Sequence, residues 1–223
     1  NYPDGTLNPV AFFSMEFGLG EALPLYAGGL GILAGDYLKT ASDLNVPMVG
    51  VGILFQEGYF RQVIDNSSWQ IEAYPYNDPT SLPIRPVIGS DGSWLRVSLE
   101  LPGRLLWLKV WRAQVGRVTL YLLDSNVALN RPADRGITNK LYDDRPEIRL
   151  LQEIILGIGG WRVLNALKIP VEVCHINEGH AAFVAVERAR NFMQQTGEPF
   201  SVAMCAVRSG NIFTTHTPVA AGL

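Results

Sequence analysis

The sequence predicts an α/β fold in which a doubly wound parallel sheet carries an antiparallel β insertion. Apolar residues recur every three or four positions between 28 and 44, which is the helical period. Between 94 and 123 they alternate with polar residues instead, which is the period of antiparallel strands. Four short apolar runs have the length and composition of buried strands: 10–15, 46–55, 171–176 and 211–215. Strand, helix and strand in succession form the unit of a parallel sheet.

The second half of the chain predicts two more helices. Pro146 suits the first turn of a helix, where a missing amide hydrogen does no harm. Asp143 and Asp144 precede it, where negative charge favours the helix dipole. The apolar stripe of this helix drifts around its surface near Gly159-Gly160. The second helix is predicted at 179–195.

Two segments, 16–27 and 56–92, are predicted to be irregular, since glycine and proline interrupt the first and proline, asparagine, aspartate and tyrosine dominate the second. Both ends of the chain look cut. It begins at Asn1 without a methionine and stops at Leu223 directly after a polar segment. We therefore expect a fragment of a longer protein.

The amino-acid composition argues against some classes of protein function. The chain has 223 residues, of which 48% are hydrophobic and 17% charged, so it can build a large core. Its formal net charge of -3 argues against a general nucleic-acid binder. No apolar run reaches the roughly 18–20 residues that cross a bilayer, and no signal peptide is visible. Cys174 and Cys205 show no metal or redox spacing, so both are predicted to be buried free thiols, which fits a cytoplasmic protein.

Polar clusters follow three of the predicted strands. They are the glycine-containing loop at 16–31, the run Asn177-Glu178-Gly179-His180, and the run Thr215-His216-Thr217. In open parallel sheets, ligands bind beyond the carboxyl ends of the strands. We therefore expect the three clusters to converge on one site.

The glycines at 28, 29 and 31 open a predicted helix. Without Cβ atoms they let backbone amides approach a ligand, and a helix N-terminus favours an anion such as a phosphate. The alternative is a tight turn whose glycines serve helix–strand packing. The run from Gly29 to Ala34 also matches the dinucleotide pattern G-x-G-x-x-A, but no acidic residue closes the second strand.

The histidines suggest binding or structural roles rather than a metal site. His175, Glu178 and His180 do not have the spacing of helical metal ligands, so no metal is predicted. His175 is expected to be hydrogen-bonded inside the sheet. Glu178 and His180 are expected to be more exposed and to bind sugar hydroxyls, with helix capping as the alternative. His216, between two threonines, is a candidate for a cleft-facing residue, although a lone histidine is more often structural.

Five ordered segments together resemble the α-glucan phosphorylases of the bacterial glycogen or maltodextrin type. They are FFSMEFGLGEALPLYAGGLGILAGDYLKTASDL, VGVGILFQEGYFRQ, RPEIRLLQEIILGIGGWRVL, HINEGHAAF and IFTTHTPVAAGL. The resemblance implies the N-terminal half of a two-domain, Rossmann-like GT-B fold. Residues 1–223 would be part of that domain, with the β insertion at about 93–124 and the C-terminal cofactor domain absent.

The resemblance also implies an activity. Members of this family cleave α-1,4-glucan with inorganic phosphate, release glucose 1-phosphate with retained configuration and use pyridoxal 5'-phosphate. The expected partners are therefore the glucan and phosphate, with no nucleic acid or membrane, and a homodimer is compatible with the complete protein. Lys39, Lys109, Lys140 and Lys168 match no cofactor motif and are expected to be solvated. We therefore expect the Schiff-base lysine outside this chain, half an active site within it, and negligible phosphorolysis by it alone.

Site residues follow from the same resemblance. It implies that His216 is catalytic, with its carbonyl stabilising positive charge on the anomeric carbon. The other candidate substrate-binding residues are Gly28, Gly29, Leu30, Asp143, Asp144, Glu178, His180 and Thr217. Gly28 and Gly29 would face the substrate phosphate, whereas Asp143 and Asp144 would lie near a mobile gate.

Two alternatives stay open. Glycogen and starch synthases share the architecture and the glycine turn, but place a lysine just before that turn, where this chain has Tyr26-Ala27. The other alternative is a glucan-binding domain without chemistry, whose antiparallel strands present Trp94, Trp107 and Trp111 to a sugar chain.

Overall fold

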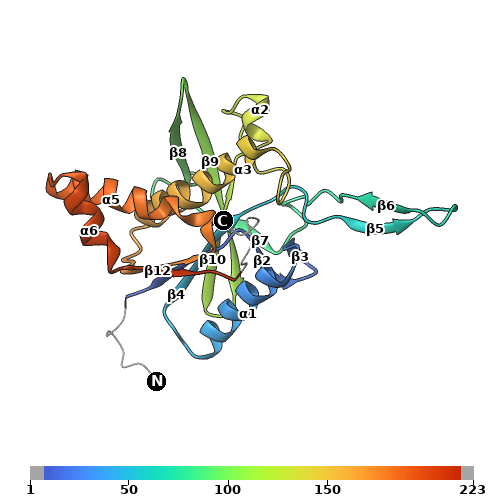
Figure 1. Cartoon of the computed structure of the whole chain (residues 1–223), viewed down its shortest axis with the longest axis horizontal. Helices are drawn as coiled ribbons and strands as arrows, with labels where there is room; N and C mark the ends of the chain where they lie inside the picture. Colours follow the sequence, from blue (N-terminus) through green and yellow to red (C-terminus); the bar gives the residue numbers. More distant parts are fainter. Residues whose placement is uncertain (1–7, 217–223) are drawn as a thin grey trace.

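The computed structural model describes residues 8–216, which fold around an eight-stranded mixed sheet (Figure 1). The strand order is β12-β11-β1-β4-β10-β9-β7, and β8 pairs with β9. The strands of this sheet are β1 (Val10–Phe13), β4 (Met48–Ile53), β7 (Ile84–Pro86), β8 (Arg96–Leu101), β9 (Arg104–Val115), β10 (Val118–Asp124), β11 (Val173–Asn177) and β12 (Asn211–Thr214).

The sheet confirms the predicted α/β class. Strands β12, β11, β1, β4 and β10 are parallel, and β9, β8 and β7 are antiparallel. The predicted antiparallel strands continue the parallel sheet, because β10 pairs in parallel with β4 on one side and antiparallel with β9 on the other.

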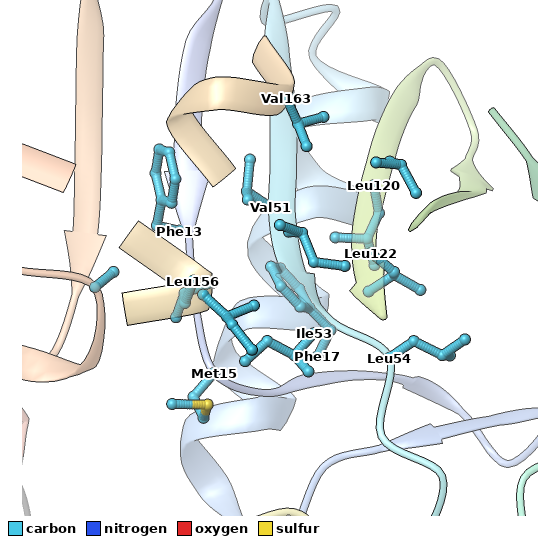
Figure 2. Close-up of a cluster of buried hydrophobic side chains, with 14 of the residues drawn as sticks. Phe13, Met15, Phe17, Val51, Ile53, Leu54, Leu120, Leu122, Leu156 and Val163 are labelled. Carbon is cyan, nitrogen blue, oxygen red and sulfur yellow. The ribbon is translucent and has the colours of Figure 1, made fainter. Parts of the chain in front are cut away.

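Helices cover both faces of the parallel strands. Helix α1 (Gly29–Asp43) lies on one face, where a Cβ added at Gly50 would come 3.1 Å from Leu38 Cδ1. The next residue, Val51, points to the opposite face, where a Cβ added at Gly160 would lie 2.6 Å from Val51 Cγ1. Figure 2 shows Phe13, Val51, Leu156 and Val163 packed together on this second face.

The helix predicted from Pro146 is interrupted where its apolar stripe drifts. It consists of α3 (Pro146–Ile154), a π-helical turn η1 (Ile155–Gly159) and α4 (Gly160–Ala166). The extra residue of a π turn rotates the following face around the axis. The same turn lies very close to its neighbours, because a Cβ at Gly157 would be 2.6 Å from the amide nitrogen of Val184.

Strands occur in both segments that were predicted to be irregular, so those predictions were wrong in part. Two small hairpins form there, together with edge strand β7: β2 (Phe17–Gly20) with β3 (Leu23–Leu25), and β5 (Arg61–Ile64) with β6 (Gln70–Ala73). The β5–β6 hairpin projects from the body (Figure 1) and is exposed on both faces, so its sequence lacks the alternation of a half-buried strand. Asp65 holds its turn by accepting hydrogen bonds from the amides of Ser67 and Trp69, both 2.8 Å.

The remaining elements are mostly helices near the carboxyl half of the chain: α2 (Pro132–Arg135), the 3₁₀ turn η2 (Gly179–Ala181), α5 (Phe183–Thr196) and α6 (Phe200–Arg208). Helix α6 carries Cys205 on its exposed side, so the prediction that both thiols are buried was wrong for Cys205. Cys174 is buried in β11, and burial raises the pKa of its thiol to about 12. No helix within residues 8–216 is long and apolar enough to cross a membrane.

The strand order reverses at one place in the sheet. The chain moves from β1 to β4 and β10 in one direction, whereas β11 and β12 lie on the other side of β1. In doubly wound sheets the crevice at the carboxyl ends of the strands, next to such a reversal, is where ligands bind. The loops after β1, β11 and β12 are therefore the loops that surround this crevice.

Candidate functional site

The side chain of Asn177 joins the carboxyl ends of three parallel strands. Its Nδ2 donates to Ser14 Oγ after β1 at 3.1 Å, and its Oδ1 lies 2.9 Å from Nε2 of His216 after β12. Asn177 and Ser14 are buried, so this bridge lies under the surface of the crevice. Because an amide oxygen only accepts, His216 donates from Nε2 and, when neutral, keeps Nδ1 as an acceptor.

The glycine turn is held in place by a second buried side chain, Glu16. Its Oε2 accepts hydrogen bonds from the amides of Ala27 at 2.6 Å and Gly28 at 3.2 Å. Its Oε1 accepts the hydroxyl of Tyr142, from the loop before α3. Burial, and then the charge of Glu16, hold the pKa of Tyr142 well above its ordinary value. The Glu16 carboxylate thus fixes the glycine turn through the amides of Ala27 and Gly28, while the Tyr142 phenol stays protonated.

The amides that follow this turn remain available to a ligand. Helix α1 has no side-chain cap, and its geometry leaves the first-turn amides of Gly29 and Leu30 without intrahelical partners. A Cβ added at Gly28 or Gly29 would meet nothing within 4 Å. At Gly31 it would lie 2.4 Å from Tyr26 Cβ and 2.8 Å from Glu16 Oε2. Packing therefore requires Gly31, whereas a Cβ at Gly28 or Gly29 would point into open space at the N-terminus of α1.

Glu178 was expected to be exposed, but it is fully buried. Its Oε1 accepts the amide of His216 at 2.5 Å, and its Oε2 accepts the hydroxyl of Thr215 at 3.2 Å. Its backbone has φ 63° and ψ 178°, a conformation that is almost restricted to glycine. The surrounding contacts must therefore hold a strained residue in place, and they anchor the backbone at His216.

His180 was also expected to be exposed and is buried. The 3₁₀ turn η2 places its Nδ1 3.6 Å from Glu153 Oε1 and its ring 5.9 Å from the ring of Tyr142. His175 has the structural role that was predicted, since its Nε2 lies 2.5 Å from Thr214 Oγ1 on the neighbouring strand. Burial, followed by the proximity of His216, lowers the pKa of His175.

The two aspartates of the predicted gate differ in their surroundings. Asp143 is buried and receives the amide of Arg145 at 3.0 Å and its guanidinium at 2.8 and 2.7 Å. These hydrogen bonds hold the pKa of Asp143 below its usual range. Asp144 is exposed. The carboxylate of Asp143 thus holds Arg145 at the start of α3. Of the two carboxylates, only that of Asp144 faces solvent. Thr217 lies outside the described residues.

Sequence reasoning missed the residues that connect these clusters. Glu16 lay in the loop at 16–31 without a predicted role of its own, and Ser14 and Tyr142 were not singled out. An acidic residue directly after a buried strand was a usable signal for Glu16. Tyr142 gave none, because it reaches Glu16 across 126 positions of sequence.

Comparison with known proteins gives relatives over nearly the whole chain. No family model matches the sequence. A glycogen phosphorylase of Mycobacterium tuberculosis is 47% identical over 220 residues, which are 96% of this chain and 26% of that protein. A maltodextrin phosphorylase of Thermococcus litoralis is 46% identical over 222 residues, which are 100% of this chain and 26% of that protein. A glycogen phosphorylase of Aquifex aeolicus is 38% identical over 218 residues. The chain therefore spans about a quarter of the length of the first two relatives.

Proposed function

We propose that this chain, which is homologous over nearly its whole length to part of the glycogen and maltodextrin phosphorylases, contributes half of the active site of an α-1,4-glucan phosphorylase. The reaction would transfer the terminal glucosyl unit of a glycogen or maltodextrin chain to inorganic phosphate, giving glucose 1-phosphate. The observation that carries the proposal is the pair of hydrogen bonds made by Asn177. They connect Ser14, after β1 and before the glycine turn, to His216, after β12.

The glycine turn supplies the anion-binding side. Phosphorolysis must hold a phosphate next to an electron-poor sugar carbon, and fixed amides do so with little reorganisation. The amides of Gly29 and Leu30 stand at the N-terminus of a 15-residue helix, whose dipole adds to their attraction for an anion. Glu16 accepts hydrogen bonds from the preceding amides of Ala27 and Gly28, so the turn is preorganised without a ligand.

The end of β12 supplies the sugar-binding side. The Nδ1 atom of neutral His216 is an acceptor for a sugar hydroxyl, since Nε2 donates to Asn177. In this proposal the His216 carbonyl stabilises positive charge on the anomeric carbon, and Thr217 contacts the same sugar. Glu178 does not reach the sugar in this arrangement. It acts as a positioning residue that anchors the amide of His216.

The lysines of the chain do not fit an imine site for pyridoxal phosphate. Lys109 pairs with Asp124 at 3.2 Å and is largely buried, contrary to the expectation that it is solvated. Lys140 lies 4.3 Å from the centre of the Tyr74 ring, and Lys39 and Lys168 are exposed. In this proposal the cofactor is therefore bound by a part of the complete enzyme outside these residues. Negligible activity of the 223 residues alone, a cytoplasmic location and a homodimer of the complete protein belong to the same proposal.

The test is an assay of the complete protein that contains these residues. Incubation with maltoheptaose and inorganic phosphate should release glucose 1-phosphate, measured by coupling to its conversion and to NADPH formation. Transfer from a nucleotide sugar in place of phosphorolysis would support the synthase alternative and overturn the proposal. Glucan binding with neither reaction would support the binding-domain alternative.

A further inference from the structure

Tyr142 adopts a backbone conformation that bulky residues rarely take, with a φ of 56° in the left-handed region. The loop is held before this residue, where the Leu141 amide donates to the carbonyl of Glu57 at 3.3 Å. It is held after this residue by the ion pair of Asp143 with Arg145. Strained backbone of this kind persists where its surroundings over-determine it, and it clusters at functional sites. The side chain of Tyr142 is therefore kept in one direction by the loop on both sides of it.

This direction brings the phenol of Tyr142 to Glu16, in the loop after β1. The hydroxyl donates to Glu16 Oε1, whereas Glu16 Oε2 accepts the amides of Ala27 and Gly28. Glu16 is only 2% exposed, so its carboxylate relies on protein donors in place of water. Among residues 8–216, Tyr142 is the only one that offers this carboxylate a side-chain donor. The orientation of the carboxylate therefore depends on the Tyr142 hydroxyl.

Any shift of Glu16 is transmitted to the first turn of α1. A Cβ built at Gly31 would lie 2.8 Å from Glu16 Oε2 and 3.1 Å from Glu16 Cβ, so the side chain packs directly against that turn. The amide of Glu16 also donates to Ser14 Oγ at 3.4 Å, and Ser14 accepts from Asn177. Glu16 thus connects Tyr142 both to the glycine turn and to the buried Asn177 beneath the crevice.

The Tyr142 hydroxyl matters for the glycine turn because Glu16 is charged. Without the hydroxyl, Glu16 Oε1 would be buried without a donor, which is costly for a charged group. The carboxylate would then be drawn toward water and away from the amides of Ala27 and Gly28. These two hydrogen bonds hold the glycine turn, so the turn would lose its fixed geometry. The loss falls on the binding of an anion, since preorganised amides bind it with little reorganisation.

We propose that Tyr142 is a positioning residue that keeps Glu16 in place and thereby sets the affinity of the glycine turn for inorganic phosphate. The choice of phosphate as the ligand rests on the proposed function. Tyr142 acts through Glu16 in this arrangement and makes no contact with the phosphate itself. A merely structural Tyr142 would support the fold and leave phosphate binding unchanged.

The test measures the dissociation constant of inorganic phosphate for the complete protein, by isothermal titration calorimetry at constant ionic strength. Tyr142→Phe should raise this constant by roughly tenfold, which lies within the range of coupling between residues of one hydrogen-bond network. Tyr121→Phe is the matched control, because Tyr121 is also half-buried but lies on β10 opposite Arg112, and it should leave the constant unchanged. Glu16→Gln, which removes the charged acceptor, should also weaken phosphate binding and provides a second variant if Tyr142→Phe does not fold.

A double-mutant cycle separates action through Glu16 from direct contact with the ligand. In the Glu16→Gln background, Tyr142→Phe should change the phosphate dissociation constant by less than about twofold, because the acceptor of the hydroxyl is already altered. If the effects of the two substitutions multiply in full, Tyr142 acts on the phosphate independently of Glu16 and the positioning role is overturned.

Phosphate binding and activity can fail independently. Unchanged phosphate affinity in folded Tyr142→Phe and in Glu16→Gln overturns the positioning role, even if the wild type forms glucose 1-phosphate from maltoheptaose. Weakened phosphate binding in Tyr142→Phe, with no glucose 1-phosphate from the wild type, supports the positioning role and contradicts the proposed function. With an active wild type, the expected result for Tyr142→Phe is a higher KM for phosphate at nearly unchanged kcat.

Discussion

Asn177 Oδ1 and His216 Nε2 lie 2.9 Å apart across the ends of two neighbouring parallel strands, and the same Asn177 side chain also holds Ser14. One buried amide therefore sets the relative position of β1, β11 and β12 at the crevice. Removing the Asn177 side chain would take one hydrogen bond from Ser14 and one from His216.

Asn177→Ala should both destabilise the protein and impair catalysis. Buried polar groups left without partners cost about 1–3 kcal/mol, so the free energy of unfolding should fall by that amount. The catalytic efficiency on maltoheptaose should fall further than the stability loss explains, because His216 loses its orientation. Denaturant unfolding and steady-state kinetics measure the two effects. Asn191, which is on α5 and only weakly hydrogen-bonded at 3.5 Å to Asn165, is the matched control for asparagine removal. Equal effects of the two substitutions would contradict the role given to Asn177.

Tyr142→Phe should change how stability depends on pH. The folded state holds the pKa of Tyr142 above the ordinary value of about 10, through burial and the charge of Glu16. Above about pH 10 the unfolded phenol loses its proton and the folded one keeps it, so stability falls as pH rises. The contribution is fully present below pH 10 and absent above the folded pKa. Unfolding curves between pH 8 and pH 11 should therefore show a shallower alkaline loss in the Phe variant.

The same substitution has a control in a tyrosine that is exposed. Tyr59 is 51% exposed, so Tyr59→Phe should leave the alkaline slope as it is in the wild type. At neutral pH, Tyr142→Phe should also cost about 1.5–3 kcal/mol, because a hydrogen bond to a charged group is lost. An alkaline slope that is identical in all three proteins would show that Glu16 and Tyr142 are not coupled.

Glu178→Gln should lower activity while the protein stays folded. The amide retains the shape of the side chain but has only one oxygen to accept from His216 and Thr215. A misplacement of about 1 Å at the reacting groups can lower activity by about 100-fold, so a loss of up to that size is expected. Measuring kcat and KM separately distinguishes positioning from a merely structural role. A positioning role predicts that kcat falls in the folded variant. Glu178→Asp, which keeps the charge, should restore part of the rate.

Thiol labelling tests the fold without any assay of function. Cys205 is exposed, whereas Cys174 is buried with a pKa raised to about 12, so only Cys205 should react with a thiol reagent near neutral pH. Both should react once denaturant is added. Rapid labelling of two thiols in the native protein would mean that β11 does not lie inside the sheet.

Much of the fold followed from periodicity, and the connections of the site did not. The strand at 171–176 was predictable because a parallel strand buried on both faces is a short apolar run, and the helix at 179–195 because burial on one side leaves a helical period. Hairpin β5–β6 was not, since it is exposed on both sides. The burial of Glu178 was also unpredictable, because it depends on a strained backbone and on the amide of His216, which lies 38 positions away. Polar residues at strand ends predict a candidate site at the crevice, but only tertiary contacts decide which of these side chains are buried and which are open to a ligand.

Gly29→Ala and Gly31→Ala separate ligand approach from packing in the glycine turn. A methyl group at Gly31 would lie 2.4 Å from Tyr26 Cβ, so Gly31→Ala should lower stability by about 1–3 kcal/mol. A methyl group at Gly29 meets nothing within 4 Å, so stability should be unchanged or slightly higher. The methyl group would nevertheless stand in the first turn of α1, next to the amides that the proposed function assigns to the phosphate. Gly29→Ala should therefore raise the KM for phosphate several-fold at unchanged Tm, measured in the direction of phosphorolysis. An unchanged KM in this variant would place the phosphate elsewhere.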